Sequence, residues 1–133
     1  MGNRAVIGFI SKEGIKNKDS VGIYLHWNGG RDSVEGFLAT AKQYGVRTSE
    51  SYGVARLIQI ISNTFGGTLS VGVDQIKKLD CDNYDNGLYW VDNNFNIVGR
   101  EYNRYTEQSE YPLKEFIEEC KKVNDPHFIG ESQ

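Results

Sequence analysis

The chain has 133 residues, which suits one hydrophobic core and predicts a single domain. A formal net charge of −3 and an apolar share of 38% exclude a general duplex-binding protein, which would be broadly basic, and a disordered chain. Because no apolar run reaches the roughly 18 residues of a membrane span and no hydrophobic leader is present, we expect a cytoplasmic protein that does not bind membranes, with Cys81 and Cys120 reduced.

Two strands are predicted first, Arg4–Ile10 and Val21–Trp27, joined by a polar, lysine-rich loop. The second strand is dense in β-branched and aromatic residues, which favour extended structure. It ends at Asn28-Gly29-Gly30, a strong turn signal. A change of chain direction is therefore expected directly after Trp27.

Two amphipathic helices are predicted next. The first runs from Asp32 or Ser33, either of which could cap it, to Tyr44, and Gly45 is the glycine expected after its end. The second runs from about Ser51 to Asn63. Each carries apolar residues at helical spacing, which predicts one buried face. These residues are Val34, Phe37, Leu38 and Ala41, and then Val54, Leu57, Ile58 and Ile61.

Three further strands and a last helix follow. The strands are predicted at Thr68–Val73, Leu88–Val91 and Ile97–Tyr102, with a polar, turn-rich segment before the second. The last two strands are separated by a short turn, which predicts a hairpin. The last helix is predicted at Pro112–Val123, with its proline in the first turn.

The predicted order is β-β-α-α-β-β-β-α. It indicates an α+β fold, with an antiparallel or mixed sheet of about five strands and three helices on one face. We expect the single domain to comprise residues 1–124 and residues 125–133 to form a flexible tail.

Catalytic and metal-binding residues do not gather in a recognised pattern. His26 and His127 are isolated, and neither has a second ligand at metal-binding spacing. A calcium loop starting at Asp80 fails, because Tyr84 and Val91 occupy ligand positions. We therefore expect a binding protein that is not an enzyme and has no cofactor and no metal.

Three groups of residues suit a ligand. In Leu25–Arg31 a strand delivers aromatic, amide and guanidinium groups to a glycine turn and a helix N-terminus, which favours an anion. The loop Asp82–Gly87 offers amides to read polar ring edges and Tyr84 to stack on a ring. Several arginines suit phosphate. The candidate ligand-binding residues are Trp27, Asn28, Arg31, Arg56, Asn83, Tyr84, Asn86, Arg100 and Arg104.

Each group also has a structural alternative. Trp27 could lie in the core beside a plain strand-to-helix turn, and Asx side chains could simply brace the 82–87 loop. Single arginines are commonly partners in surface ion pairs. Taken together, arginines, amides, tyrosines and glycine turns favour a pocket for a small phosphorylated nucleotide.

The segments Gly2–Ile7, Tyr24–Gly30, Ala55–Leu57 and Cys81–Gly87 resemble small proteins of phages and mobile elements, and in function the first Thoeris anti-defence family. Its members are phage sponges that bind cyclic ADP-ribose isomers made by bacterial TIR-domain enzymes, and some also bind cyclic oligonucleotides. They assemble as dimers and higher oligomers and do not cleave the signal. The resemblance covers most of residues 2–104.

This resemblance implies adenine near an aromatic ring and an asparagine, with phosphates on arginines. Asn83 and Arg100 match those roles, Tyr84 and Trp27 are the candidate rings, and Arg56 would suit a second site between subunits. We therefore expect a homo-oligomer that sequesters a small cyclic nucleotide in the host cytoplasm.

Two alternatives remain open. A small protein with an acidic balance could instead inhibit a host defence enzyme directly. It could also be a small nucleotide-processing enzyme that uses Asp82, Asp85 or His26 as acid or base.

Overall fold

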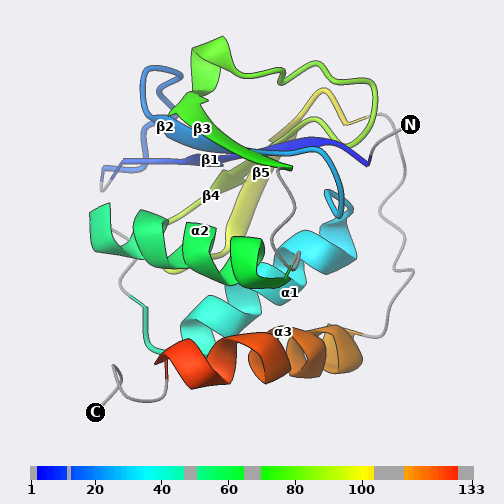
Figure 1. Ribbon diagram of the computed structural model, residues 1–133. Helices are drawn as coiled ribbons and strands as arrows, with labels where there is room; N and C mark the ends of the chain where they lie inside the picture. Colours follow the sequence, from blue (N-terminus) through cyan, green and yellow to red (C-terminus); the bar gives the residue numbers. More distant parts are fainter. Residues whose placement is uncertain (1–2, 12, 47–50, 65–69, 104–112, 129–133) are drawn as a thin grey trace.

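The strands and helices form in the predicted order (Figure 1). The structure is a computed structural model that describes residues 3–11, 13–46, 51–64, 70–103 and 113–128. It is an α+β fold, with a five-stranded mixed sheet and three α-helices in the described ranges. The elements are β1 (Ala5–Phe9), β2 (Val21–Leu25), α1 (Arg31–Gln43), α2 (Ser51–Thr64), β3 (Val71–Gln75), the short 3-10 helix η1 (Ile76–Lys78), β4 (Leu88–Val91), β5 (Ile97–Glu101) and α3 (Leu113–Phe128).

β1 lies at the centre of the sheet, whose strand order is β3-β2-β1-β4-β5. It pairs antiparallel with β2, so that Ala5 faces Leu25, and parallel with β4, so that Val6 faces Leu88. Leu88 in turn pairs with Glu101 of β5. The starts of β1 and β4 and the ends of β2 and β5 therefore meet at one end of the sheet, on the right in Figure 1. We call it the asparagine end, and it consists of residues 3–4, 26–31, 82–87 and 100–103.

All three helices lie on one side of the sheet (Figure 1). α1 and α2 lie nearer the strands, and α3 packs on their outer side. The predicted apolar faces are inside: Phe37 of α1 and Leu57 of α2 are fully buried, and Phe37 meets Phe116 of α3 edge-to-face at 5.4 Å between ring centroids. Burying one such side chain contributes about 1.5–3 kcal/mol.

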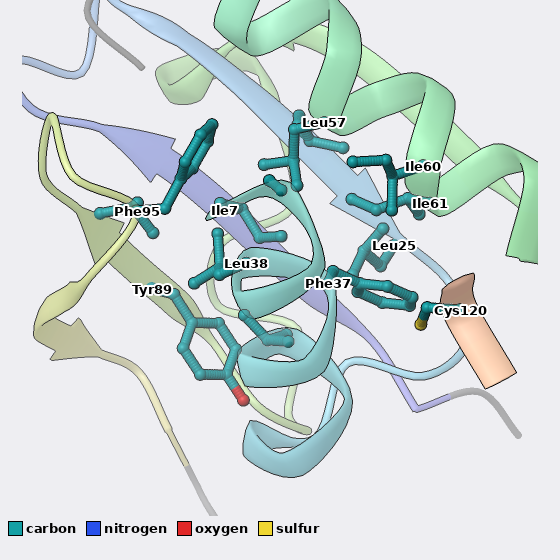
Figure 2. Close-up of a cluster of buried hydrophobic side chains, with 14 of the residues drawn as sticks. Ile7, Leu25, Phe37, Leu38, Leu57, Ile60, Ile61, Tyr89, Phe95 and Cys120 are labelled. Atoms are coloured by element: carbon teal, nitrogen blue, oxygen red, sulfur yellow. The ribbon is translucent and has the colours of Figure 1, made fainter. Parts of the chain in front are cut away.

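We call the cluster between the sheet and the helices the helix-side core (Figure 2). It is contiguous and nearly all apolar, as one folding unit requires. It comprises Ala5, Ile7, Phe9, Ile23, Leu25, Val34, Phe37, Leu38, Ala41, Leu57, Ile60, Ile61, Tyr89, Val91, Phe95, Phe116, Cys120 and Phe128.

The other face of the sheet is covered by η1 and the chain around it. Ile76 packs there with Val6, Leu88 and Trp90. A Cβ at Gly8 would lie only 2.7 Å from Ile76 Cδ1, so a glycine in β1 allows this close approach. β1 is consequently buried on both faces, as parallel-paired strands usually are.

The start of α1 differs from the prediction. Its N-cap is Gly30, with an extended backbone, so the expectation of Asp32 or Ser33 as the cap was wrong. Asp32 already belongs to the first turn, where its carboxylate accepts the N–H of Ser33 at 2.8 Å and suits the positive helix end. Gly45 follows the helix as predicted, with a φ of 70°.

The end of α3 differs as well, because the helix continues to Phe128 and includes Pro126. Phe128 is buried and stacks on Tyr44 at 4.8 Å, and the Tyr44 hydroxyl donates to the carboxylate of Asp125. The expectation of a loose tail from residue 125 was therefore wrong for residues 125–128, because tertiary packing outweighs a terminal proline.

Smaller shifts occur at two strands. β3 is displaced along the chain relative to the predicted Thr68–Val73, part of which lies outside the described residues. β5 ends at Glu101, and Tyr102 leaves the strand with a φ of 60°. None of the helices in the described ranges has the length and apolar character that crossing a membrane requires.

Candidate ligand-binding site

The sheet register brings most of the sequence-predicted residues together at the asparagine end. Residues 26–31 follow β2, residues 82–87 precede β4, and Arg100 stands near the end of β5. Arg56 lies on α2, outside these segments, and is half-buried. Arg104, like Arg47, lies outside the described residues.

Arg100 is held against the ring of Tyr89. Its guanidinium carbon lies 3.8 Å from the ring centroid, and its Nη2 donates to the carbonyl of Asn86 at 2.7 Å. The buried hydroxyl of Tyr89 donates in turn to the carbonyl of Gly29 at 2.6 Å. One tyrosine therefore connects the glycine turn with the arginine, and a cation over such a ring is favourable.

Arg31 lies close enough to interact with this pair. Burial lowers the pKa of Arg100, which its neighbour Tyr89 partly opposes and the positive charge of Arg31 reinforces. Burial also raises the pKa of Tyr89 to about 12, against the opposing charges of Arg100 and Arg31. Arg31 also bonds Glu35 on its own helix at 2.8 Å, which is the ion pair that the structural alternative predicted. An anion beside two neighbouring guanidinium groups would relieve their repulsion.

Asn83 braces its own loop. Its side-chain amide donates to the carbonyls of Asp80 and Gly87, at 2.9 and 3.4 Å. Its Oδ1 accepts the N–H groups of Asp85 and Gly87, at 3.1 and 3.0 Å. Because an amide has two donor and two acceptor positions, this buried side chain has none left for a base edge. The prediction that Asn83 contacts a ligand is therefore corrected to a bracing role.

Asn86 also makes its contacts within the protein. Its amide nitrogen donates to Oδ1 of Asn3 at 2.5 Å and to the carbonyl of Arg4 at 3.1 Å. Its carbonyl accepts from Arg100, so Asn86 touches the arginine without presenting its side chain outward. It acts as a link between β1 and the candidate phosphate-binding group.

The exposed aromatic rings gather at the same end. Trp27 is 46% exposed, Tyr84 63% and Tyr102 46%, and Tyr52 is the other exposed aromatic residue in the described ranges. The alternative that Trp27 lies in the core was therefore wrong. Tyr102 has the ammonium of Lys18 5.4 Å from its ring centroid. Exposed rings flanked by cations suit the stacking of a base.

The backbone of this end is strained. Asn28, Tyr84 and Tyr102 have φ values of 58°, 63° and 60°, and Phe95 is the fourth non-glycine residue with positive φ among those described. For a bulky residue this left-handed conformation costs about 1–2 kcal/mol. Such strain concentrates at functional sites, where the surrounding structure enforces it.

Sequence reasoning missed Asn3, Arg4 and Tyr89. Tyr89 lies in a wholly apolar strand and gives no sign of its polar role. Asn3 and Arg4 reach the site because β1 runs parallel to β4, and Arg4 pairs with Asp85 at 2.8 Å. The opposite charges of Arg4 and Asp85 were the one signal available, and local patterns do not indicate that their strands adjoin.

The other candidate catalytic or metal-binding residues that the structure describes are hydrogen-bonded or buried, or have too few metal-binding side chains beside them to hold an ion. A hydrogen bond of 3.0 Å joins Nδ1 of His26 to the hydroxyl of Tyr24. Cys120 is buried in the helix-side core. Within the described ranges, no group of three or more His, Cys, Asp or Glu side chains is placed to hold a metal ion.

A shallow pocket of about 180 Å³ lies beside α1, and none of its lining residues is among the sequence-predicted ones. It is small against the roughly 300–1,000 Å³ of typical ligand sites. It is lined by Glu35, Leu38, Ala39, Lys42, Phe95, Asn96, Ile97 and Leu113.

Comparisons with protein-family models, with curated proteins and with solved structures gave no match to this chain. The residues of the asparagine end therefore carry the functional inference.

Proposed function

We propose that the chain is a non-catalytic protein that binds a small phosphorylated nucleotide at the asparagine end. The observation that carries this proposal is the placement of Arg100 on the ring of Tyr89, whose hydroxyl bonds Gly29 two residues before Arg31, at the end of the sheet where Trp27, Tyr84 and Tyr102 are exposed. Guanidinium groups bind phosphate oxygens in pairs, and exposed rings stack on bases. The proposed site would thus combine groups that bind phosphate with groups that stack on a base.

Binding without turnover is supported by the state of the candidate acids and bases. Burial of Asp85 favours its neutral form, but hydrogen bonds and charge from Arg4 outweigh it and lower the pKa of this carboxyl. A carboxylate held in an ion pair is a poor proton carrier near neutral pH. His26 likewise has a structural partner in Tyr24.

The resemblance to the first Thoeris anti-defence family extends the proposal to the ligand. The ligand would be a cyclic nucleotide signal, such as a cyclic ADP-ribose isomer or a cyclic oligonucleotide, sequestered in the host cytoplasm as an immune-evasion device. A sponge of this kind must bind its ligand tightly and be present in amounts that match the ligand, and it needs no catalytic residue.

A thermal-shift screen tests the proposal. The panel comprises cyclic ADP-ribose isomers, cyclic dinucleotides and cyclic trinucleotides, each with its linear counterpart. A ligand at 100 times its dissociation constant stabilises the folded state by about 2.7 kcal/mol, which is a measurable shift. After heat denaturation of the complex the ligand should be recovered intact. A cleaved product, or no binding below the micromolar range, contradicts the proposal.

Matched variants locate the site. Arg100→Met and Arg31→Met should each weaken binding at least tenfold, because each removes a phosphate-binding group. Lys77→Met removes a positive charge of the Lys77–Asp19 ion pair, outside the asparagine end, and should leave the affinity unchanged. Equal losses in all three variants would indicate a general charge effect instead.

Assembly as a homo-oligomer is part of the same proposal. Leu113 and Val123 of α3 and Tyr52 of α2 are exposed apolar side chains on the helix side. Symmetric pairing through α3 would cover Leu113 and Val123, whereas pairing through α2 would cover Tyr52 and place Arg56 near the subunit interface. Light scattering at micromolar concentration should give a dimer or larger mass, and a monomer mass contradicts this part.

A protein target is the second candidate function. Trp, Tyr and Arg are the residue types that dominate protein interfaces, and all three are exposed or half-buried at the asparagine end. The chain would then inhibit a host defence enzyme directly. Stoichiometric capture of one host protein that is lost in Trp27→Ala, together with no nucleotide binding, would favour this candidate.

A further inference from the structure

Residues 3 and 4 lie between the two loops of the candidate site and bond to both. On one side, the N–H of Asn3 donates to the carbonyl of His26 at 2.9 Å. The carbonyl of Asn3 accepts the N–H of Gly29 at 2.8 Å. A Cβ at Gly29 would lie 2.5 Å from that carbonyl oxygen, so the turn is packed directly on Asn3.

On the other side, the same two residues hold the 82–87 loop. Asn86 donates its side-chain amide to Asn3 and its backbone N–H to the carbonyl of Arg4, at 2.5 and 3.0 Å. Asp85 Oδ2 accepts both the backbone N–H and the Nε of Arg4, at 3.1 and 2.8 Å. The side chains of Arg4 and Asp85 are 31% and 12% exposed, so this ion pair is partly shielded from water.

We propose that Asp85 is a positioning residue, which through Arg4 and Asn3 sets the placement of the glycine turn at residues 26–30. Asp85 has no role in contacting the ligand. It fixes residues 3–4, and these fix the turn from which Trp27, Asn28 and Arg31 extend. The effect on ligand affinity rests on the proposed function, whereas the coupling between the loops is a property of the ligand-free chain.

For the substitution of Asp85, an electrostatic role and a positioning role predict opposite changes in the affinity for an anion. Removing a negative charge from the asparagine end should strengthen the binding of an anion if charge alone matters. Releasing Arg4 should weaken it if placement matters, because the phosphate-binding and stacking groups lose their common geometry. Asp82 is exposed in the same loop and offers a matched removal of one negative charge.

The experiment compares Asp85→Asn, Arg4→Lys and Asp82→Asn in the full chain. Amide hydrogen exchange of the ligand-free protein is followed at residues 26–30, with residues 57–61 of α2 as the reference for global opening. Asp85→Asn and Arg4→Lys should each raise exchange at Gly29 about tenfold, because the first removes the charge of the ion pair and the second removes its Nε donor. Asp82→Asn should leave it unchanged. Arg4→Lys retains the positive charge, so it gives the same readout should Asp85→Asn destabilise the whole chain.

Affinity for cyclic ADP-ribose, with inorganic pyrophosphate as the probe without a base, is the second measurement. Asp85→Asn and Arg4→Lys should lower it about tenfold, and Asp82→Asn should leave it equal or higher. Exchange that rises only within residues 82–87 overturns the proposal. Tighter binding by both aspartate variants overturns it as well. Coupled exchange with no binding of either probe supports the positioning role and contradicts the proposed function, so the two failures are distinguishable.

Discussion

The helix-side core and the asparagine end are made by the same strands, yet they differ in which residue types are buried and in backbone conformation. In the core the buried residues are apolar, and all of them except Phe95, whose φ is 60°, lie in regular strands and helices. At the asparagine end the buried residues include Asn83, Asp85 and Asn86, while the aromatic rings face outward on a strained backbone. Because stability and the proposed ligand recognition thus reside in different residues, substitutions should separate the two properties.

The largest effect is expected in the core. Phe37→Ala removes a fully buried ring and should lower the free energy of unfolding by about 3–5 kcal/mol, measured by urea denaturation. In conditions where the variant is still folded, its ligand affinity should equal that of the parent chain. Gln43→Ala at the exposed end of α1 is the control. A loss below about 1 kcal/mol would contradict the core position of Phe37.

Asn83→Ala tests whether a site residue can be purely structural. It removes several hydrogen bonds and leaves buried backbone N–H groups unpaired, so the expected loss is about 2–3 kcal/mol. Asn94→Ala, in the exposed turn between β4 and β5, should change stability little. Unchanged stability with lost binding would restore Asn83 as a ligand contact.

Tyr89 belongs to both regions, and its hydroxyl is the part that serves the asparagine end. Tyr89→Phe should cost about 1 kcal/mol near neutral pH, because the carbonyl of Gly29 loses its donor. The pKa of Tyr89 is raised from 10.0 to about 12, so its contribution is complete below pH 10 and is lost as the pH rises toward 12. Stability between these pH values should therefore fall more in the parent chain than in Tyr89→Phe. Tyr52→Phe, an exposed tyrosine, should behave like the parent.

The smallest change in stability is expected at Tyr84, where the substitution should not lower the stability, unlike the three substitutions above. Tyr84→Asn places a residue that tolerates positive φ, so thermal denaturation should show equal or higher stability, by up to about 1 kcal/mol. Nucleotide affinity should fall about tenfold, because one stacking ring is lost. A clear loss of stability would contradict the strain at this position.

Local patterns predicted the elements of this fold because apolar residues recur at one spacing along a buried helix face and at another along a strand. Leu57 and Phe37 were placed inside from spacing alone, and both are buried. The pairing of β1 with β4 was beyond such patterns, since it joins Val6 to Leu88 across two helices. The last turn of α3 was missed for a similar reason: its stability comes from Phe128 packing on Tyr44.

The residue types of the candidate site were predictable from the sequence, but the role of each residue was less so. Arg31 and Arg100 were chosen because guanidinium groups suit phosphate, and Tyr89 connects Arg100 to the glycine turn that Arg31 follows. Asn83 was chosen for the same kind of reason, although its amide is consumed by its own loop. An asparagine in a loop has the same local sequence whether it faces a ligand or its own backbone, so only the three-dimensional arrangement distinguishes the two.

The central place of β1 has a consequence for the order in which the protein is made. β1 is synthesised before β4, its parallel neighbour, and cannot complete its pairing until Leu88 and the residues after it have emerged from the ribosome. Contacts so distant along the chain form slowly. Asn3 can bond His26 and Gly29 earlier, but the contacts of residues 3–4 with Asp85 and Asn86 need that segment, so the asparagine end is completed after α1 and α2 can already have formed. A newly made chain would therefore complete the proposed ligand site only after β4 and β5 have been synthesised.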